Sequence, residues 1–157
     1  MIVRVLLAVL LAAALVTAAM PAIEDARSGV AASTADRETQ RVAEAVDRLP
    51  RRSDPVPRDV PGARRVLDVD PGPRGTIRIG AAPGVSGLDA DGDVVSFEAG
   101  GTRDRSPVAP PVRVVGQNGT LLRDGRPLVV RDRLHVVLRY ELVDGRPVVT
   151  VARLYPG

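Results

Sequence analysis

The sequence predicts an α+β protein in which a long N-terminal helix precedes an antiparallel β-meander head. Three observations predict this fold class. The first third of the chain carries a long apolar run and then helical periodicity, a proline-rich segment follows, and the remainder is rich in valine with turn residues at short intervals. A chain of 157 residues has room for one modest core beside such a helix.

The composition limits which side chains can form the core and which kinds of functional site the chain can contain. Rings are scarce, with Phe97, Tyr140 and Tyr155 and no tryptophan, so the core must consist of aliphatic side chains. Cysteine is absent, which excludes disulfides, thiolate metal sites and a cysteine nucleophile. All 22 basic residues are arginines that alternate with acids, and the net charge is +3. Because the positive charges are not clustered, we expect no nucleic-acid groove.

Residues 1–23 are predicted to form a transmembrane signal-anchor helix. Residues 5–23 carry no charge, and at about 1.5 Å per residue they reach about 28 Å, close to the ~30 Å of a bilayer core. Arg4 precedes this run, while Glu24 and Asp25 follow it. A positive residue on the N-terminal side favours a cytoplasmic N-terminus. We therefore expect a single-pass protein of the cell membrane with an extracytoplasmic C-terminal domain.

Two other interpretations of this segment stay open. Small residues at Val16-Thr17-Ala18 and Thr17-Ala18-Ala19 would suit a signal peptidase, which would release the protein. A buried helix of a globular protein would also be apolar, although the chain has no long hydrophobic segment downstream to cover it. The run is longer than the about 7 to 15 residues of an ordinary signal core and passes directly into a helical pattern, so we prefer the anchor.

Residues 24–49 are predicted to continue the helix with an amphipathic face. Their apolar side chains recur at i, i+3, i+4 and i+7, which places them on one stripe among charged neighbours. These side chains are Val42, Ala45, Val46 and Leu49. Pro21 would bend the helix, and residues 28–34 contain weak helix formers. We expect one long interrupted helix over about residues 2–49, or two helices meeting near residue 30, with Pro50 ending the helix in both cases.

Residues 50–63 contain four prolines and are predicted to be a semi-extended linker, because prolines at this density disfavour helix and sheet. This linker would separate a helical stalk from a β-rich extracytoplasmic domain over residues 64–157. Turn chemistry is predicted at 70–75 and 89–93, and a longer surface loop at 99–111. The predicted strands cover residues 64–69, 76–81, 93–98, 112–115, 119–123, 126–130, 133–143 and 146–155.

An Asp-Gly-Arg-Pro unit occurs at 124–127 and again at 144–147. Asp-Gly suits a two-residue hairpin turn, whose central residues take positive φ, so two successive hairpins would form a meander. In the second hairpin, Val143 would face Arg146, and one face would be apolar and covered by helix 24–49. This face comprises Leu134, Val136, Leu138, Tyr140 and Leu142 on one strand, with Tyr140 opposite Val149, Leu138 opposite Val151 and Leu134 opposite Tyr155. The mixed face comprises His135, Arg139, Glu141, Arg146 and Thr150.

Motifs that could carry chemistry are few. The acids of residues 89–93 have the spacing of a calcium loop, but its glycine falls one place early and position twelve is Gly100, so a hairpin turn is preferred. Residues 80–84 lack the lysine and the helix of a phosphate loop. His135 is the single histidine, and no nucleophile elbow accompanies it. We expect no catalytic, metal-binding or cofactor-binding residues and no small-molecule substrate, and an exported enzyme ranks last.

Asn118 is a candidate N-glycosylation site. It is the single asparagine in the chain and begins the sequon Asn118-Gly119-Thr120 in a predicted turn. The predicted topology places this turn outside the cell. The alternative is that Asn118 was selected as a turn residue that tolerates positive φ.

The order of the segments carries a resemblance. An apolar N-terminal helix with a proline toward its outer end, an amphipathic continuation to Leu49, a linker and a β-meander head together resemble the layout of type IV pilins and of minor pseudopilins. The segments MIVRVLLAVLLAAALVTAAMPAIEDAR and DVPGARRVLDV resemble short membrane-anchored proteins of halophilic archaea that occur alongside type IV pilus-like assembly systems.

The resemblance implies a structural or assembly component of a surface filament or secretion system. Its partners would be the membrane, other pilin-like subunits and a pilus assembly ATPase with its platform. Two features depart from pilins: no short basic leader precedes the apolar run, and the acid that pilins place early in that run is missing, since Glu24 lies beyond its end. The protein is then unprocessed, or pilin-like in shape alone. The alternative function is a secreted β-domain binding module, released by cleavage near Ala18 or Ala19.

Overall fold

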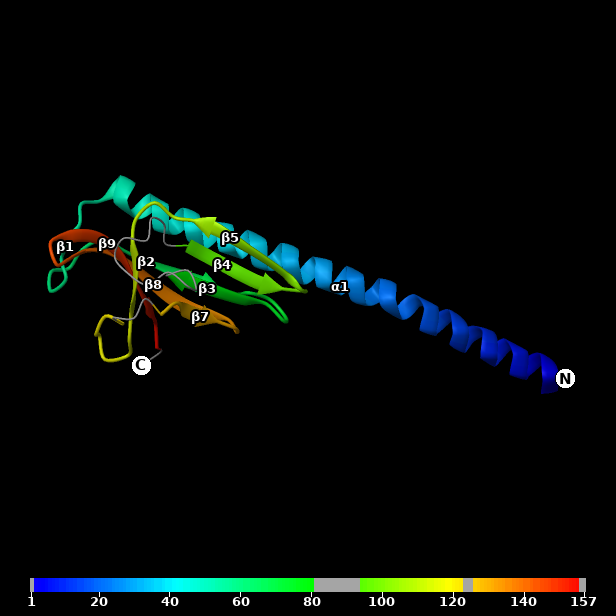
Figure 1. The fold of residues 1–157 in the computed structure, drawn as a ribbon. Helices are drawn as coiled ribbons and strands as arrows, with labels where there is room; N and C mark the ends of the chain where they lie inside the picture. Colours follow the sequence, from blue (N-terminus) through cyan, green and yellow to red (C-terminus); the bar gives the residue numbers. More distant parts are fainter. Residues whose placement is uncertain (1, 81–93, 123–125, 156–157) are drawn as a thin grey trace.

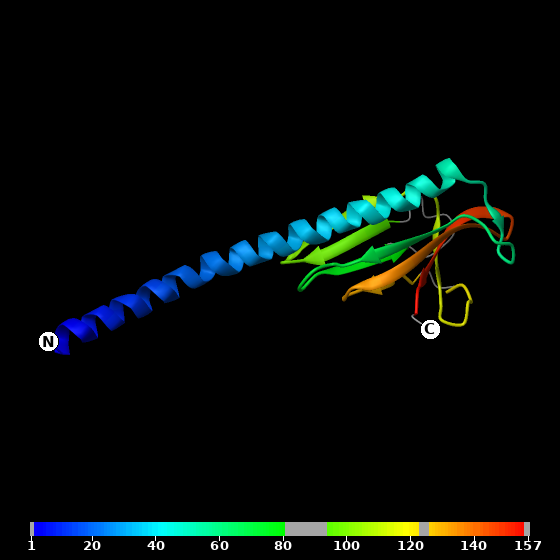
Figure 2. The ribbon, with the colours of Figure 1, turned by 180° about the vertical axis from the view of Figure 1, so that it is seen from behind.

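A computed structural model describes residues 2–80, 94–122 and 126–155. In this part of the chain one long helix, α1 (Ile2–Arg52), is followed by nine strands in two sheets, which confirms the α+β class. The N-terminal half of α1 extends away from the head and its C-terminal half lies along it (Figures 1 and 2). The strands are β1 (Val56–Pro57), β2 (Arg64–Val69), β3 (Thr76–Gly80), β4 (Val94–Ala99), β5 (Thr102–Pro107), β6 (Val112–Val115), β7 (Leu128–Val130), β8 (Leu134–Val143) and β9 (Arg146–Arg153).

Helix α1 continues through every predicted weak point. It contains Pro21 and runs through residues 28–34, so the predicted interruption near residue 30 is wrong. Packing of the second half against the head outweighs the low helix propensity of this region. The helix also includes Pro50 and ends at Arg52, so Pro50 does not end it. The hydroxyl of Ser53 donates to the carbonyl of Leu49 at 2.7 Å and satisfies one of the acceptors left at the helix end.

The proline-rich segment joins helix and sheet instead of separating a stalk from a head. Its strand β1 pairs in parallel with β8, Val56 lying opposite Glu141, so the expectation that this segment avoids sheet structure is wrong. A proline is tolerated in such a short strand because an edge strand leaves one side of its backbone without ladder bonds. The backbone N–H of Tyr140 also donates to Ala63, which holds the end of the segment to β8.

The strands form one mixed sheet and one antiparallel sheet. Sheet A contains β1 and β2 along the same side of β8, followed by β9 and β6, with parallel pairing at β1–β8 and β6–β9. Sheet B has the order β5-β4-β3-β7 and is antiparallel throughout. A single antiparallel meander therefore does not describe the head, since sheet A combines distant segments in both directions.

The second predicted hairpin forms with the predicted register. Asp144 and Gly145 have φ of 51° and 75°, Val143 pairs with Arg146, and the pairs farther along follow in step. Leu134 does not pair with Tyr155, because β9 ends at Arg153 and Tyr155 is 48% exposed. The fully buried residues of the predicted apolar face are Val136, Leu138, Val149 and Val151.

The first predicted hairpin does not form as predicted. Its turn, residues 123–125, lies outside the described residues, and residues 119–122 make one isolated bridge, Leu121 to Val115, instead of a strand. Strand β7 pairs with β3 in sheet B. The two Asp-Gly-Arg-Pro units therefore lead into strands of different sheets, which local sequence similarity does not distinguish.

The segment predicted as a surface loop at 99–111 contains strand β5. It pairs with β4 through a tight turn in which Gly100 and Gly101 both have positive φ, 57° and 80°. β5 lies at the edge of sheet B and exposes charged side chains such as Asp104. Charges protect an edge strand from pairing with other chains, and the same charges give its sequence the appearance of a loop.

The core is shared by α1 and the inner faces of both sheets. Its largest fully buried side chains include Ile77 and Ile79 of sheet B and Leu138 of sheet A. α1 contributes the face from Ala31 to Leu49, which packs most extensively against β4 and also reaches β5, β2, β8 and β3. The amphipathic helix thus covers mainly sheet B, whereas we expected it to cover the β8–β9 hairpin.

Candidate functional site

The N-terminal half of α1 is exposed on every side although it is strongly apolar. Its large side chains range from 47% exposed at Ile23 to 79% at Val3. α1 is long and apolar enough to cross a membrane, and none of its most apolar stretch is buried in the chain. This helix half is therefore compatible with a membrane anchor or a signal sequence, and its interpretation as a core helix of this chain is wrong. The other large apolar side chains exposed here are Val5, Leu6, Leu7, Val9, Leu10, Leu11, Leu15, Val16 and Met20.

The one polar side chain of the apolar run has an internal partner. The hydroxyl of Thr17 donates to the carbonyl oxygen of Ala13 at 2.8 Å. Within a bilayer no water is present to bond a free hydroxyl, so a hydrogen bond to the preceding helical turn is what lipid exposure requires. Thr17 is therefore no obstacle to insertion of residues 5–23.

The head makes its first contacts with α1 where the apolar run ends. Arg74, in the turn between β2 and β3, forms an ion pair with Glu24 at 2.6 Å between Nη1 and Oε1. The hydrogen bond from Arg74 is the main cause that lowers the pKa of Glu24. In the β4–β5 turn, a Cβ built on Gly100 would lie 2.4 Å from the carbonyl oxygen of Ser28. The apolar run and the head are thus adjacent, with no free stalk between them.

The structure places His135 on the exposed face of β8, opposite Asp68 of β2. Asp68 accepts a hydrogen bond from Arg133 at 2.9 Å from Nε, and this bond is the main cause that lowers the pKa of Asp68 and raises that of Arg133. Among the described residues no group of three histidine, cysteine, aspartate or glutamate side chains could hold a metal ion. The calcium-like acids at 89–93 lie outside the described residues.

Asn118 lies in an exposed turn, as predicted. The backbone N–H of Gly116 donates to Thr120 at 2.8 Å, and the side-chain oxygen of Asn118 accepts a hydrogen bond from the hydroxyl of Thr120 at 2.6 Å. Positive φ occurs at Gly119 and not at Asn118. A need for positive φ therefore does not explain the asparagine, and its glycosylation stays a prediction.

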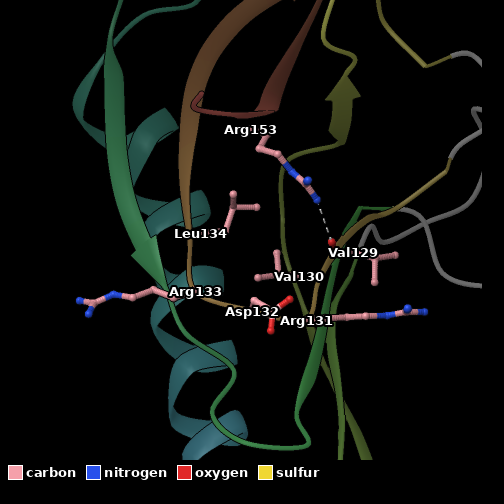
Figure 3. Close-up of a pocket in the computed structure, with 7 residues that line it drawn as sticks. All are labelled: Val129, Val130, Arg131, Asp132, Arg133, Leu134 and Arg153. Carbon is pink, nitrogen blue, oxygen red and sulfur yellow. Dashed lines mark hydrogen bonds between the residues drawn. The ribbon is translucent and has the colours of Figure 1, made fainter. Parts of the chain in front are cut away.

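An open cavity of about 490 Å³ lies at the ends of β7, β8 and β9, lined by residues 129–134 and Arg153 (Figure 3). Nη2 of Arg153 donates to the carbonyl of Val129 at 3.5 Å. Arg131 and Arg133 extend to opposite sides (Figure 3). Arg133 forms an ion pair with Asp68 of β2. Ligand sites combine an enclosed pocket with convergent polar groups. This cavity does not bring its arginines together.

A buried carboxylate on sheet A is a feature that sequence reasoning missed. Glu141 was expected on the mixed, solvated face of β8, yet it is 4% exposed and accepts a hydrogen bond from the hydroxyl of Thr150 at 3.1 Å. Arg139 lies 3.7 Å and Arg58 3.8 Å from its two oxygens. Strand alternation correctly placed Glu141 and Thr150 on one face. No sequence signal indicated that Arg58, from the proline-rich segment, would lie beside them.

The comparisons with known proteins identify a family without assigning an activity. The family described as a domain of unknown function, DUF7311, matches residues 2–154. No curated protein and no solved structure matches the chain. The family match runs from the second residue through the end of β9, so it includes α1 and the strands of both sheets. The chain therefore belongs to the DUF7311 family.

Proposed function

We propose that this protein is a membrane-anchored, pilin-like structural or assembly component of a type IV pilus-like surface filament or secretion system. The observation that carries the proposal is the division of α1. Its first half is apolar and exposed all round, while its second half packs against a β-rich head. A pilin-like layout requires this division, because the first half must serve the membrane or the filament while the second supports the folded domain.

In this proposal the N-terminus is cytoplasmic and the head is extracytoplasmic. Arg4 before the apolar run supports this orientation, as do Glu24 and Asp25 after it. The contact between Arg74 and Glu24 would hold the head close to the extracytoplasmic surface of the cell membrane. Its partners would be lipid, the apolar helices of like subunits, and an assembly ATPase with its platform. The role is structural and includes no catalytic step.

The alternative is a secreted β-domain binding module. The small residues around Ala18 and Ala19 favour it, because a signal peptidase selects such side chains. Cleavage there would remove exposed residues and leave the packed face from Ala31 to Leu49 intact. A released head would keep its core, so folding of the head does not distinguish the two functions.

Single cysteines distinguish anchor from secreted module, because the chain has no cysteine of its own. Val3 precedes Arg4 and the uncharged run of residues 5–23, so Val3→Cys places a cysteine at the N-terminal end of the anchor, whereas Arg51→Cys places one at the exposed end of the packed half. We expect a membrane-impermeant maleimide to label Arg51→Cys in intact cells, and Val3→Cys only after permeabilisation. The secreted module predicts that Val3→Cys is lost from the mature protein, which mass spectrometry would find starting at Ala19 or Met20.

The pilin-like role is tested by partners in the membrane. We expect the full chain, isolated from its native membrane in mild detergent, to co-purify with an assembly ATPase and a polytopic platform protein. A single cysteine in the apolar half, Val9→Cys, is expected to cross-link to a like subunit, because Val9 is 63% exposed. An anchored chain that lacks both interactions would refute the filament role while leaving the anchor intact.

A further inference from the structure

We propose that the outer face of sheet A, the face turned away from the core, binds an acidic amphipathic segment of a partner protein. Two parallel rows of side chains cross this face from strand to strand. One row is rich in arginine and the next is apolar. The strand register fixes both rows, so the proposal does not depend on the role of α1 in a membrane.

The arginine row crosses four strands. Arg64 of β2 lies directly opposite Arg139 of β8, Arg139 opposite Thr150 of β9, and Thr150 beside Arg113 of β6. Arg64 and Arg139 are exposed and Arg113 is half-buried, whereas Thr150 is buried, so the arginines are the accessible part of the row. Like charges directly opposite one another in a sheet destabilise it. Among the described residues the side chain of Arg64 has no hydrogen bond or ion pair. An anionic partner would neutralise this repulsion and gain the free donors of Arg64.

The buried carboxylate of Glu141 lies beside this row and forms ion pairs with two arginines at distances too long for hydrogen bonds. Arg139 and Arg58 lie 3.7 and 3.8 Å from Glu141, whereas a charge-assisted N–H···O bond is about 2.7–2.9 Å long. The side chain of Arg139 is 50% exposed and that of Arg58 is 35% exposed. Arg58 also donates to the carbonyl of Gly119, which fixes its position. The ion pairs with Glu141 therefore leave guanidinium donors of both arginines for a ligand, while the contacts with Glu141 and Gly119 restrict where these groups lie.

The neighbouring row indicates that the partner is a polypeptide. Val66, Val137, Ala152 and Val115 lie side by side on four strands, two residues along from the arginines. Val66 is 50% exposed. These rows contain no aromatic side chain on which a base or sugar could stack. A spacing of two residues, about 7 Å along a strand, is within the width of a helix, so one amphipathic helix can place carboxylates on one row and apolar side chains on the other.

The test measures binding of a synthetic helical peptide that carries a stripe of glutamates beside a stripe of leucines. The full chain in nanodiscs of uncharged lipid is titrated against the labelled peptide, and fluorescence anisotropy reports binding. Control peptides replace glutamate with lysine or leucine with alanine, and heparin and a DNA oligonucleotide are tested as anions of other classes. We expect the glutamate-leucine peptide to bind at least about fivefold more tightly than every control.

Arg64→Ala and Arg139→Ala are each expected to weaken binding at least about fivefold, because each removes a charged donor from the row. Because the side chain of Arg64 has no hydrogen bond or ion pair among the described residues, Arg64→Ala should not lower the melting temperature of the native chain. Arg105→Ala on the distant edge strand β5 is the matched control and should bind normally. Equal binding by Arg64→Ala, tighter binding of heparin or DNA, or no binding of the glutamate-leucine peptide would overturn the proposal.

Discussion

The two halves of α1 form one continuous helix but hide their apolar side chains in different ways. The half before Glu24 is apolar around its whole circumference, and the described part of the chain leaves it exposed on every side. The half from Ala31 to Leu49 has one apolar stripe, which the two sheets cover. The comparison teaches that the distribution of apolar side chains around a helix, and not their number alone, indicates what will surround it.

The largest expected effect is a charge placed on the packed half. Val46 is fully buried in the core, so Val46→Asp buries a carboxylate without a partner and should cost about 4 kcal/mol of the free energy of unfolding. Circular dichroism should show a head that is unfolded or melts far below the native chain. Membrane retention should not change, and loss of retention would contradict the separation of the two halves.

The matching change in the exposed half is Leu11→Asp. Leu11 lies near the middle of the apolar run and is 61% exposed. A carboxylate at the centre of a membrane helix costs about 2.5–3.5 kcal/mol of insertion free energy. Alkaline carbonate should then release a substantial fraction of the chain from vesicles, while the melting temperature of the head stays native. A lowered melting temperature with full retention would show that this half belongs to the core after all.

A third change acts where the halves meet. Gly100→Ala would place a methyl group against the carbonyl of Ser28 and impose positive φ on an alanine. We expect a loss of about 2 kcal/mol in the free energy of unfolding, from backbone strain together with displacement of the β4–β5 turn. Gly101→Ala is the control, because its φ is also positive but its Cβ would meet nothing within 4 Å. Chemical denaturation should find Gly100→Ala clearly the less stable of the two.

The packed half contains a polar atom that the described structure leaves unsatisfied. The hydroxyl of Thr39 is buried and has no hydrogen-bond partner. Thr39→Val keeps the shape of the side chain and removes this cost, so it should raise the free energy of unfolding by about 1 kcal/mol. A destabilised variant, measured by urea denaturation, would mean that the hydroxyl is bonded in solution.

The smallest expected effect is a pH dependence of the junction. The pKa of Glu24 lies below its model-compound value of 4.5 because Arg74 stabilises the carboxylate. The stabilisation is therefore present above about pH 4.5 and is lost as the pH falls through the lowered pKa of the folded state. Glu24→Gln should lower the melting temperature slightly at pH 6 and much less at pH 3. Asp25→Asn, at a residue that has no hydrogen bond or ion pair with Arg74 among the described residues, should show no such difference.

Sequence reasoning succeeded where neighbouring residues decide the outcome. The β8–β9 hairpin followed from Asp144-Gly145, because these two residues fix both the turn and the register. It failed where distant segments decide the pairing. The sequence of β5 predicts a loop because it is charged, and the structure shows that these charges lie on an edge strand. The burial of Glu141 depends on Arg58, which comes from another part of the chain.

The sequence by itself determined the long helix, the apolar character of its first half and the turn chemistry of the second hairpin, because these depend on residues close together along the chain. Tertiary structure alone decided that β7 joins sheet B and that α1 packs mainly against β4. It also decided that β1 pairs in parallel with β8 and that β6 pairs in parallel with β9. These choices depend on which apolar faces meet across long loops. Many such pairings satisfy the same alternation of side chains, so local patterns do not select among them.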